Sequence, residues 1–141
     1  GPVLASHHNC RALVPGDRQL TDDQIKTLIQ RGAVIGAAFD NWMLIPGWKK
    51  YVTPLETVTL ELVADHIDHV CQLAGNCRHS GIGTDLDGGF GKEQSLFVLH
   101  TIPHVRKVSE ILDRRGYSRE DVARIMHGNF IEFFSRHLPA A

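Results

Sequence analysis

The sequence predicts an α/β fold with about three parallel strands and flanking helices, and two observations lead to this prediction. Short apolar runs of the kind that form buried strands occupy residues 3–6, 33–39 and 80–84. Helical segments lie between and after these runs. Because parallel strands need a long crossover connection, usually a helix, this order of elements indicates βαβ units.

Each predicted helix has a recognisable start, stop or apolar face. Thr21 is the expected N-cap of the first helix, with Gln24 in the capping-box position and Gly32 at its end. The second helix carries apolar residues at a spacing of three and four, and Gly75 ends it. Ser118 is the expected cap of the last helix. The helices are predicted over residues 21–31, 58–74, 102–115 and 119–137.

The number of strands suggests a larger architecture. The run over 33–39 contains several small residues, which suits a closely packed parallel strand. Three parallel strands cannot close a barrel, and the first begins at residue 3. A complete (β/α)8 barrel usually takes ~250 residues, whereas this chain has 141. We therefore expect residues 1–141 to be a single segment, the C-terminal part of a TIM-type barrel.

Composition excludes several classes of protein. The chain is 43% hydrophobic and 22% charged, with a formal net charge of -1, so it offers no basis for binding nucleic acid. No apolar run approaches the ~18 residues of a membrane helix, and no signal-peptide pattern is present. Three cysteines without paired spacing suggest free thiols in a reducing compartment. These features predict a cytoplasmic location.

Two polar residues stand directly after predicted strands, where barrel enzymes carry their chemistry. His7 follows the first strand, and its imidazole could ligate a metal or could simply bond to the backbone. Asp85 follows the third strand among glycines, which let a ligand approach the backbone closely. Its carboxylate could bind a metal, act as a base on metal-bound water, or cap the next loop.

Neighbouring residues offer weaker candidates. Arg18 lies in a turn, where its guanidinium could hold a substrate carboxylate or remain a solvated surface group. His8 points away from His7 if the strand persists, and we expect it to support the metal or contact substrate. Asp87 is expected to support Asp85 or to form the turn. His66 and His69 lack the spacing and the glutamate of the HExxH zinc motif, so both are expected to form structural hydrogen bonds.

Several separated motifs resemble those of the renal (membrane) dipeptidase family, and their wording is closest to its bacterial branch. They are ASH at 5–7, DRQLTDD at 17–23, VADHIDH at 63–69, GTDLDG at 83–88 and MHGNF at 126–130. Members of that family are metallopeptidases with an amidohydrolase-type (β/α)8 barrel. The resemblance covers nearly all of the chain and corresponds to about the final third of such a barrel.

The resemblance implies a role for each candidate. His7 matches a histidine ligand of the second of two zinc ions, Arg18 matches the arginine that holds the terminal carboxylate of the substrate, and Asp85 matches the acid that shuttles a proton between the bridging water and the leaving amine. His8 and Asp87 would support these groups. The family hydrolyses dipeptides, tolerates a D-residue at the C-terminal position, and in some members opens β-lactams.

The chain also departs from the family pattern. The His-x-Asp motif of the first barrel strand, the bridging glutamate and the other strand-end histidine are missing from it, and His8 replaces a small polar residue. We therefore expect the chain to be inactive alone, and to associate with itself or with the missing barrel portion through open strand edges. Two alternatives remain: a non-catalytic relative that serves binding or assembly, and another amidohydrolase-type deacylase.

Overall fold

A computed structural model describes residues 1–86 and 89–138, and it confirms an α/β fold. Its sheet has two parallel strands, β1 (Ile35–Ala37) and β2 (Ser80–Ile82), with Gly36 opposite Gly81. The strands are shorter than the runs that predict them. The α-helices are α1 (Asp22–Gln30), α2 (Leu60–Ala74), α3 (Lys107–Arg114), α4 (Arg119–Ala123) and α5 (Asn129–His137).

The prediction of a third parallel strand over residues 3–6 is wrong as stated. This segment makes one isolated parallel bridge, between Ala5 and Ile35. The Ala5 amide donates to the Val34 carbonyl at 3.0 Å, and the Gly36 amide donates to the Ala5 carbonyl at 2.8 Å. The backbone then bends at Ser6, so the ladder stops after one bridge. The segment nevertheless runs beside β1 where a third strand was expected.

The helices begin and end close to their predicted bounds. Thr21 forms the predicted capping box: its side chain accepts from the Gln24 amide at 3.2 Å, and the Gln24 side chain accepts from the Thr21 amide at 2.9 Å. Gly75 ends α2 with a φ of 67°, in the left-handed region that favours glycine. The Ser118 side chain caps α4 by accepting from the Asp121 amide at 3.1 Å.

Two predicted helices are interrupted. The segment 102–115 starts as a 3-10 helix, Ile102–Arg106, whose second residue is a proline, and it becomes α-helical only in α3. Residues Arg124–Gly128 adopt π-helical geometry between α4 and α5. Further 3-10 turns form at Asn41–Met43, Leu55–Thr57 and Lys92–Gln94.

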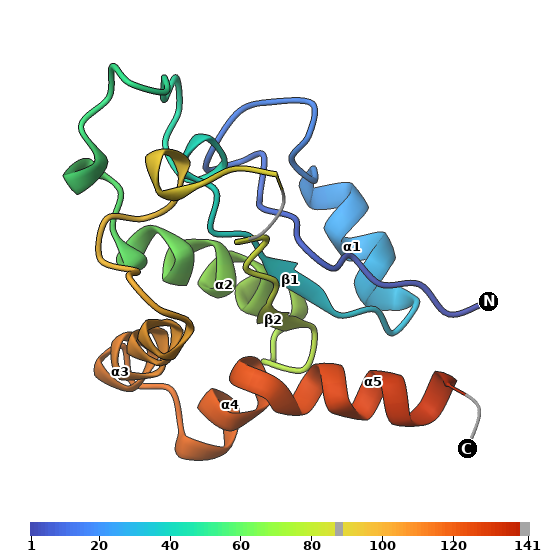
Figure 1. The fold of residues 1–141 in the computed structure, drawn as a ribbon. Helices are drawn as coiled ribbons and strands as arrows, with labels where there is room; N and C mark the ends of the chain where they lie inside the picture. Colours follow the sequence, from blue (N-terminus) through green and yellow to red (C-terminus); the bar gives the residue numbers. More distant parts are fainter. Residues whose placement is uncertain (87–88, 139–141) are drawn as a thin grey trace.

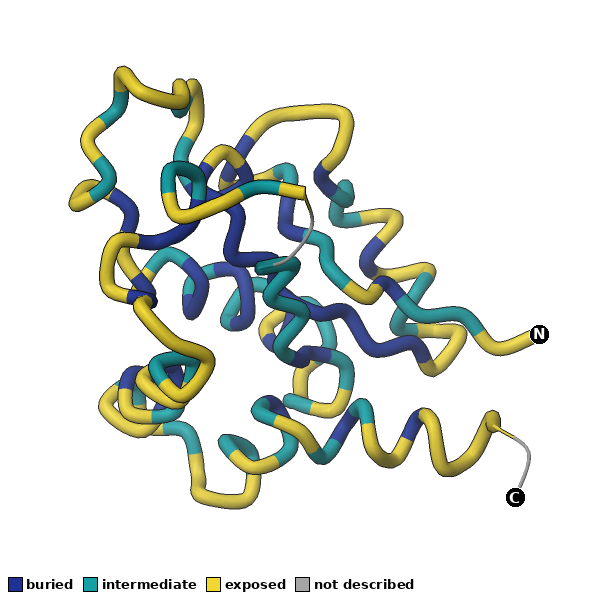
Figure 2. The backbone as a smooth tube through the Cα atoms, viewed as in Figure 1, coloured by how far each residue is buried: buried dark blue, intermediate teal, exposed yellow. Residues whose placement is uncertain are grey.

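Helix α2 is the centre of the packing (Figure 1). It contacts both strands and lies between α1 and α3, whereas α5 and the π-helical segment pack against β2. Figure 2 shows that burial concentrates on the strands and on the side of α2 that faces them, while much of α5 is exposed. The largest core side chains include Phe39, Ile67 and Leu112. None of the described helices has the length and apolar character needed to span a membrane.

An ion network fixes α3 to α2. The Arg115 guanidinium, just after α3, pairs with Glu61, Asp65 and Asp68, which share one face of α2. The Tyr117 hydroxyl donates to the same Asp68 carboxylate. One arginine thus satisfies three carboxylates that would otherwise repel one another along the helix.

Two glycines allow the first segment to cross close to the sheet. A Cβ atom on Gly83 would lie 1.8 Å from the Ser6 carbonyl oxygen, and one on Gly36 would lie 2.2 Å from the same oxygen. No larger residue fits either position without moving the backbone. The sequence predicted that glycines before Asp85 admit a ligand, but the atom that approaches Gly83 here is the Ser6 carbonyl oxygen. This close approach sets the path of the chain into His7.

Candidate active site at the carboxyl edge of the sheet

The carboxyl ends of three chain segments meet at one edge of the sheet. The His8 amide donates to the Gly36 carbonyl at 2.8 Å, which fixes the first segment beside β1. The Phe39 amide donates to the Thr84 carbonyl at 3.0 Å, which joins the residues after β1 to those after β2. His7 and Asp85 therefore follow the two segments that flank β1, at the same edge of the sheet.

His7 is half-buried, and its ring is oriented by two neighbours. A hydrogen bond of 2.7 Å joins Ser6 Oγ to His7 Nδ1. Among the described residues Nε2 has no hydrogen-bond partner. The His8 ring stacks on the His7 ring at 5.6 Å with 29° between the planes. His8 was expected to point away from His7 only if the strand persisted, and the backbone instead bends at Ser6, so the two rings stack.

Arg18 lies beside this histidine pair, eleven residues after His7. Its guanidinium donates to the His7 carbonyl at 3.4 Å and is otherwise exposed. Burial, together with the nearby positive charge of Arg18, lowers the pKa of His8 to about 4. His8 is thus neutral at pH 7 and does not compete with Arg18 for an anion. The structure brings Arg18 to the predicted site.

Asp85 lies three residues after the end of β2, at the start of the following loop. Its φ of 58° places a non-glycine residue in the left-handed region, which typically costs ~1–3 kcal/mol and recurs at functional sites. Its side chain lies close enough to Asp40 for the two negative charges to repel, and this repulsion raises the pKa of Asp40 in addition to burial. Asp87, the other predicted acid of this loop, lies outside the described residues.

The structure adds three residues that were not predicted as part of the site. Asp40 follows β1 and is only 4% exposed. Its Oδ2 accepts hydrogen bonds from Trp42 Nε1 at 2.6 Å and from Gln94 Nε2 at 2.8 Å. The signal was present in the sequence, because Asp40 directly follows the apolar run 33–39 just as His7 and Asp85 follow theirs.

The histidines of α2 have the structural roles that the sequence predicts. His66 Nδ1 accepts from the Cys10 amide at 3.0 Å, and burial lowers the pKa of His66 to about 4. His69 Nε2 lies 2.8 Å from the Asp22 carboxylate at the start of α1. Both side chains join α2 to the first 22 residues.

The donor set for a metal is partial. Among the described residues, no three His, Cys, Asp or Glu side chains are grouped to hold a metal ion. His7 on its own suits a ligand role, since metal-bound histidines usually hydrogen-bond through their second ring nitrogen, as Nδ1 does here to Ser6. Within this chain, His7 thus fits as one ligand of a metal but not as a metal centre.

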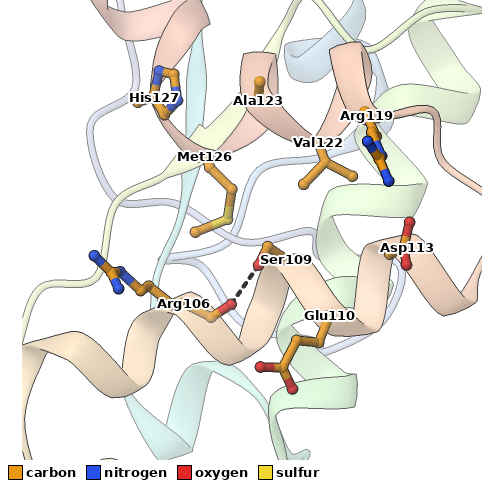
Figure 3. A pocket seen from close by; sticks show the side chains of 9 residues that line it. All are labelled: Arg106, Ser109, Glu110, Asp113, Arg119, Val122, Ala123, Met126 and His127. Carbon is orange, nitrogen blue, oxygen red and sulfur yellow. Dashed lines mark hydrogen bonds between the residues drawn. The ribbon is translucent and has the colours of Figure 1, made fainter.

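A groove of about 600 Å³ lies elsewhere, between α3 and the segment formed by α4 and the π-helical turns. Figure 3 shows Met126 and Val122 projecting into it, with Arg106 and Arg119 at its borders and the acids Glu110 and Asp113 on α3. None of the predicted site residues lines this groove. This groove is therefore separate from the candidate active site at the carboxyl edge of the sheet.

Solved structures share this fold. One match, described as the dipeptidase AC, a metallopeptidase, has a TM-score of 0.82 and 23% identity, and the alignment covers 99% of this chain and 38% of that one. A metallopeptidase from Rhodobacter sphaeroides, bound to a phosphinate mimic of L-Ala-D-Ala, gives a TM-score of 0.82 at 24% identity, covering 96% of this chain and 36% of the other.

Curated relatives point to the same family. Dipeptidase tcpJ of Claviceps purpurea is 35% identical over 130 residues, which is 92% of this chain and 28% of that protein. Dipeptidase aclJ of Aspergillus oryzae is 30% identical over 132 residues, again 92% of this chain and 28% of that protein. The chain thus spans less than a third of the length of these two relatives. The sequence profile of the membrane dipeptidase family, peptidase family M19, matches residues 1–137, and the chain belongs to this family.

Proposed function

We propose that this chain is the C-terminal part of a (β/α)8 barrel dipeptidase that hydrolyses dipeptides with zinc. The observation that supports the proposal is that His7, with Arg18 bonded to its carbonyl, and Asp85 both follow segments that end at the carboxyl edge of one parallel sheet. That edge is where barrel enzymes build their active sites. Membership of the family supports the activity, and the share of each relative that the chain covers supports the partial barrel.

Arg18 would bind the terminal carboxylate of the dipeptide. A guanidinium can hold a carboxylate through two parallel hydrogen bonds, which fixes the direction of the peptide as well as its position. Arg18 suits this role because, among the described residues, its side chain makes only one hydrogen bond, a long one to the His7 carbonyl. Binding the carboxylate at this point restricts the site to short peptides and orients the scissile bond.

Asp85 would move the proton. A carboxylate at the strand end can take a proton from the attacking water and return it to the leaving amine. The backbone of Asp85 lies in the left-handed region, with a φ of 58°. Retaining this strained conformation is consistent with a role in the site rather than in packing.

His7 would supply one zinc ligand through Nε2, with Nδ1 donating to Ser6 Oγ. Zinc at this site would lower the pKa of a bound water and polarise the peptide carbonyl. The described residues do not complete the ligand set, so the remaining ligands would come from another part of the barrel. His8, neutral and stacked on His7, would keep the ligand ring in place, and Asp87 remains a predicted support of Asp85.

Isolated residues 1–141 would then neither bind two zinc ions tightly nor turn over substrate. Within the described part of the chain, β2 pairs only with β1, so one of its edges is open. This edge would join the missing barrel portion or a second copy of the chain. The three free cysteines are consistent with a reducing cytoplasmic compartment.

A non-catalytic binding or assembly role is the second candidate, and the incomplete donor set favours it. The two candidates differ at Arg18. If the natural protein that contains this chain is a dipeptidase, Arg18→Ala should reduce kcat/KM for a dipeptide by about 100-fold, since a bidentate charged contact is lost. The exposed Arg78 offers a matched control, and Arg78→Ala should change little.

The same pair of variants tests the deacylase alternative. A deacylase acting on neutral amides would lose little activity with Arg18→Ala, whereas a dipeptidase would lose activity only towards substrates with a free carboxylate. Equal rates for Arg18→Ala and Arg78→Ala on dipeptides would reject the proposed role of Arg18. Zinc-loaded natural protein that binds dipeptides without hydrolysing them would favour the non-catalytic reading.

A further inference from the structure

The contacts around Asp40 form a connection between the two loops that border the candidate active site. One loop follows β1 and contains Trp42, and the other follows Asp85 and contains Gln94. Asp40 Oδ2 accepts a hydrogen bond from each of these side chains, at 2.6 and 2.8 Å. A single buried carboxylate oxygen therefore joins an indole from one loop to an amide from the other.

Backbone contacts support the same connection. Asp40 and Ser95 form an isolated antiparallel bridge, and Asn41 Nδ2 donates to the Ser95 carbonyl at 3.2 Å. The Asn41 side chain is fully buried at this point. The segment around Ser95 is thus attached to the end of β1 by a short extended pairing, and the Asp40 carboxylate stands at its centre.

The second loop also has hydrogen bonds within itself, between Lys92 and residues 96–99. Lys92 Nζ donates to the carbonyls of Leu96, Phe97 and Leu99 at 2.8, 2.6 and 2.8 Å. One ammonium group thus joins three carbonyls of residues 96–99, on the C-terminal side of Gln94. A contact at Gln94 therefore bears on the segment from Lys92 to Leu99.

The neighbourhood of Asp85 makes the connection relevant to chemistry. The Phe39 amide, one residue before Asp40, donates to the Thr84 carbonyl, one residue before Asp85. Asp85 adopts a strained φ of 58°, which persists only where the surroundings enforce it. Asp40 feels the charge of Asp85 directly, because the pKa of Asp40 is raised by burial first and by Asp85 as a further cause.

We propose that Asp40 is a positioning residue: its carboxylate oxygen joins the Trp42 indole to the Gln94 amide, and the adjoining backbone bond from Phe39 to Thr84 lets this connection hold Asp85 in its reactive orientation. The role in catalysis rests on the proposed dipeptidase function, whereas the positioning of the loops does not. Trp42 is 38% exposed, so its indole is available at the rim once Asp40 has oriented it.

The first experiment measures how rigidly the Trp42 indole is held, and it does not require enzymatic activity. In a Trp48→Phe background, Trp42 is the only tryptophan of the chain, and its near-ultraviolet circular dichroism reports how rigidly it is held. Asp40→Ala and Gln94→Ala should both weaken this signal, whereas Asp40→Asn should retain it because the amide oxygen still accepts both hydrogen bonds. The exposed Gln72 gives the matched control, Gln72→Ala.

The second experiment measures kinetics in the natural protein that contains this chain. A misplacement of about 1 Å can cost ~100-fold in rate, so Gln94→Ala should lower kcat by about tenfold or more with KM nearly unchanged, since Arg18 still holds the substrate. Asp40→Asn should retain kcat within about threefold, which a requirement for the charge of Asp40 would not allow. Gln94→Ala is preferred to Asp40→Ala here, because Gln94 is half-buried and its loss leaves the core intact.

The outcomes separate the two proposals. If the indole signal of Gln94→Ala and Asp40→Ala matches that of the Gln72→Ala control, Asp40 does not position the loops and the inference is overturned. If the signal weakens as expected but the natural protein hydrolyses no dipeptide, the loop connection stands and the dipeptidase function fails. A kcat for Gln94→Ala equal to that of Gln72→Ala would remove the role in catalysis.

Discussion

Replacing Gly83 by alanine tests the close approach that places His7. A Cβ on Gly83 would lie 1.8 Å from the Ser6 carbonyl oxygen and 2.9 Å from the Ser6 carbonyl carbon, whereas ordinary contacts begin at 3.4 Å. Both obstructing atoms belong to the backbone, so no side chain can rotate away. The first segment would have to move off the sheet by more than about 1 Å to admit one methyl group.

The expected cost follows from this geometry. Overpacking by a methyl group typically costs ~1–3 kcal/mol, and we expect the upper half of that range because the Ser6 carbonyl is fixed by its neighbours Ala5 and His8, which bond to the Gly36 backbone. Gly81→Ala would meet the Phe130 ring at 2.6 Å, a side chain that can shift, so its cost should be smaller. Gly16→Ala has nothing within 4 Å and should be near neutral.

Urea unfolding of the three variants, followed by circular dichroism, measures these costs. The midpoints should fall in the order Gly16→Ala, Gly81→Ala, Gly83→Ala, with unchanged slopes. A Gly83→Ala variant as stable as Gly16→Ala would refute the close approach of Ser6 to the sheet. It would also remove the structural reason for placing His7 beside Asp85.

Three further predictions concern stability. Burial lowers the pKa of His66 from 6.5 to about 4, so between these pH values the unfolded chain binds a proton that the folded chain does not bind. The free energy of unfolding should therefore be highest above pH 6.5 and fall as the pH drops towards 4. Urea titrations at several pH values should show a smaller fall for His66→Asn. Arg115→Ala should cost ~1–3 kcal/mol in thermal or urea unfolding, because three carboxylates of α2 lose their common partner, and a loss below about 0.3 kcal/mol would contradict the network. Asn129→Ala should destabilise by ~1–3 kcal/mol, because the Asn129 amide donates to the Cys77 and Ser80 carbonyls beside β2; hydrogen exchange at Ile82 that equals the wild-type rate would count against it.

The sequence predicted the helix ends correctly where the capping residues are close together in the chain. Thr21 with Gln24 predicted the start of α1, and Gly75 the end of α2, because caps depend on a few neighbouring residues. The run 3–6 was predicted as a full strand and forms only one bridge. Its extent depends on where Gly36 and Gly83 allow Ser6 to cross, which no pattern within residues 3–6 can reveal.

The sequence predicted site residues that directly follow apolar runs, but it did not predict residues that reach the site through contacts distant in sequence. His7 and Asp85 were found because each ends an apolar run, and the family motifs indicated Arg18. Asp40 meets the same criterion but was not predicted, because its partners Trp42 and Gln94 are two and 54 residues away. A hydrogen bond across 54 residues leaves no periodic signal in the sequence.

The orientation of the histidines also needed the structure. Alternation along a strand would have separated His7 from His8, and the bend at Ser6 instead stacks their rings. The buried amide of Asn9, which donates to the Ala38 and Met43 carbonyls at 3.1 Å each, then fixes the following turn to the end of β1. These contacts join residues about 30 positions apart, beyond the reach of helical or strand periodicity.

Zinc-dependent hydrolysis of a dipeptide by the natural protein that contains this chain, measured for the wild type and for Asp85→Asn, tests the central claim most directly. We expect a chelator to abolish activity, zinc to restore it, and Asp85→Asn to lower kcat by ~100-fold or more, as loss of general acid-base catalysis does. Asp113→Asn, at an exposed acid of α3, should match the wild type. A folded, zinc-loaded protein that hydrolyses no dipeptide, or an Asp85→Asn variant as active as Asp113→Asn, would contradict the account.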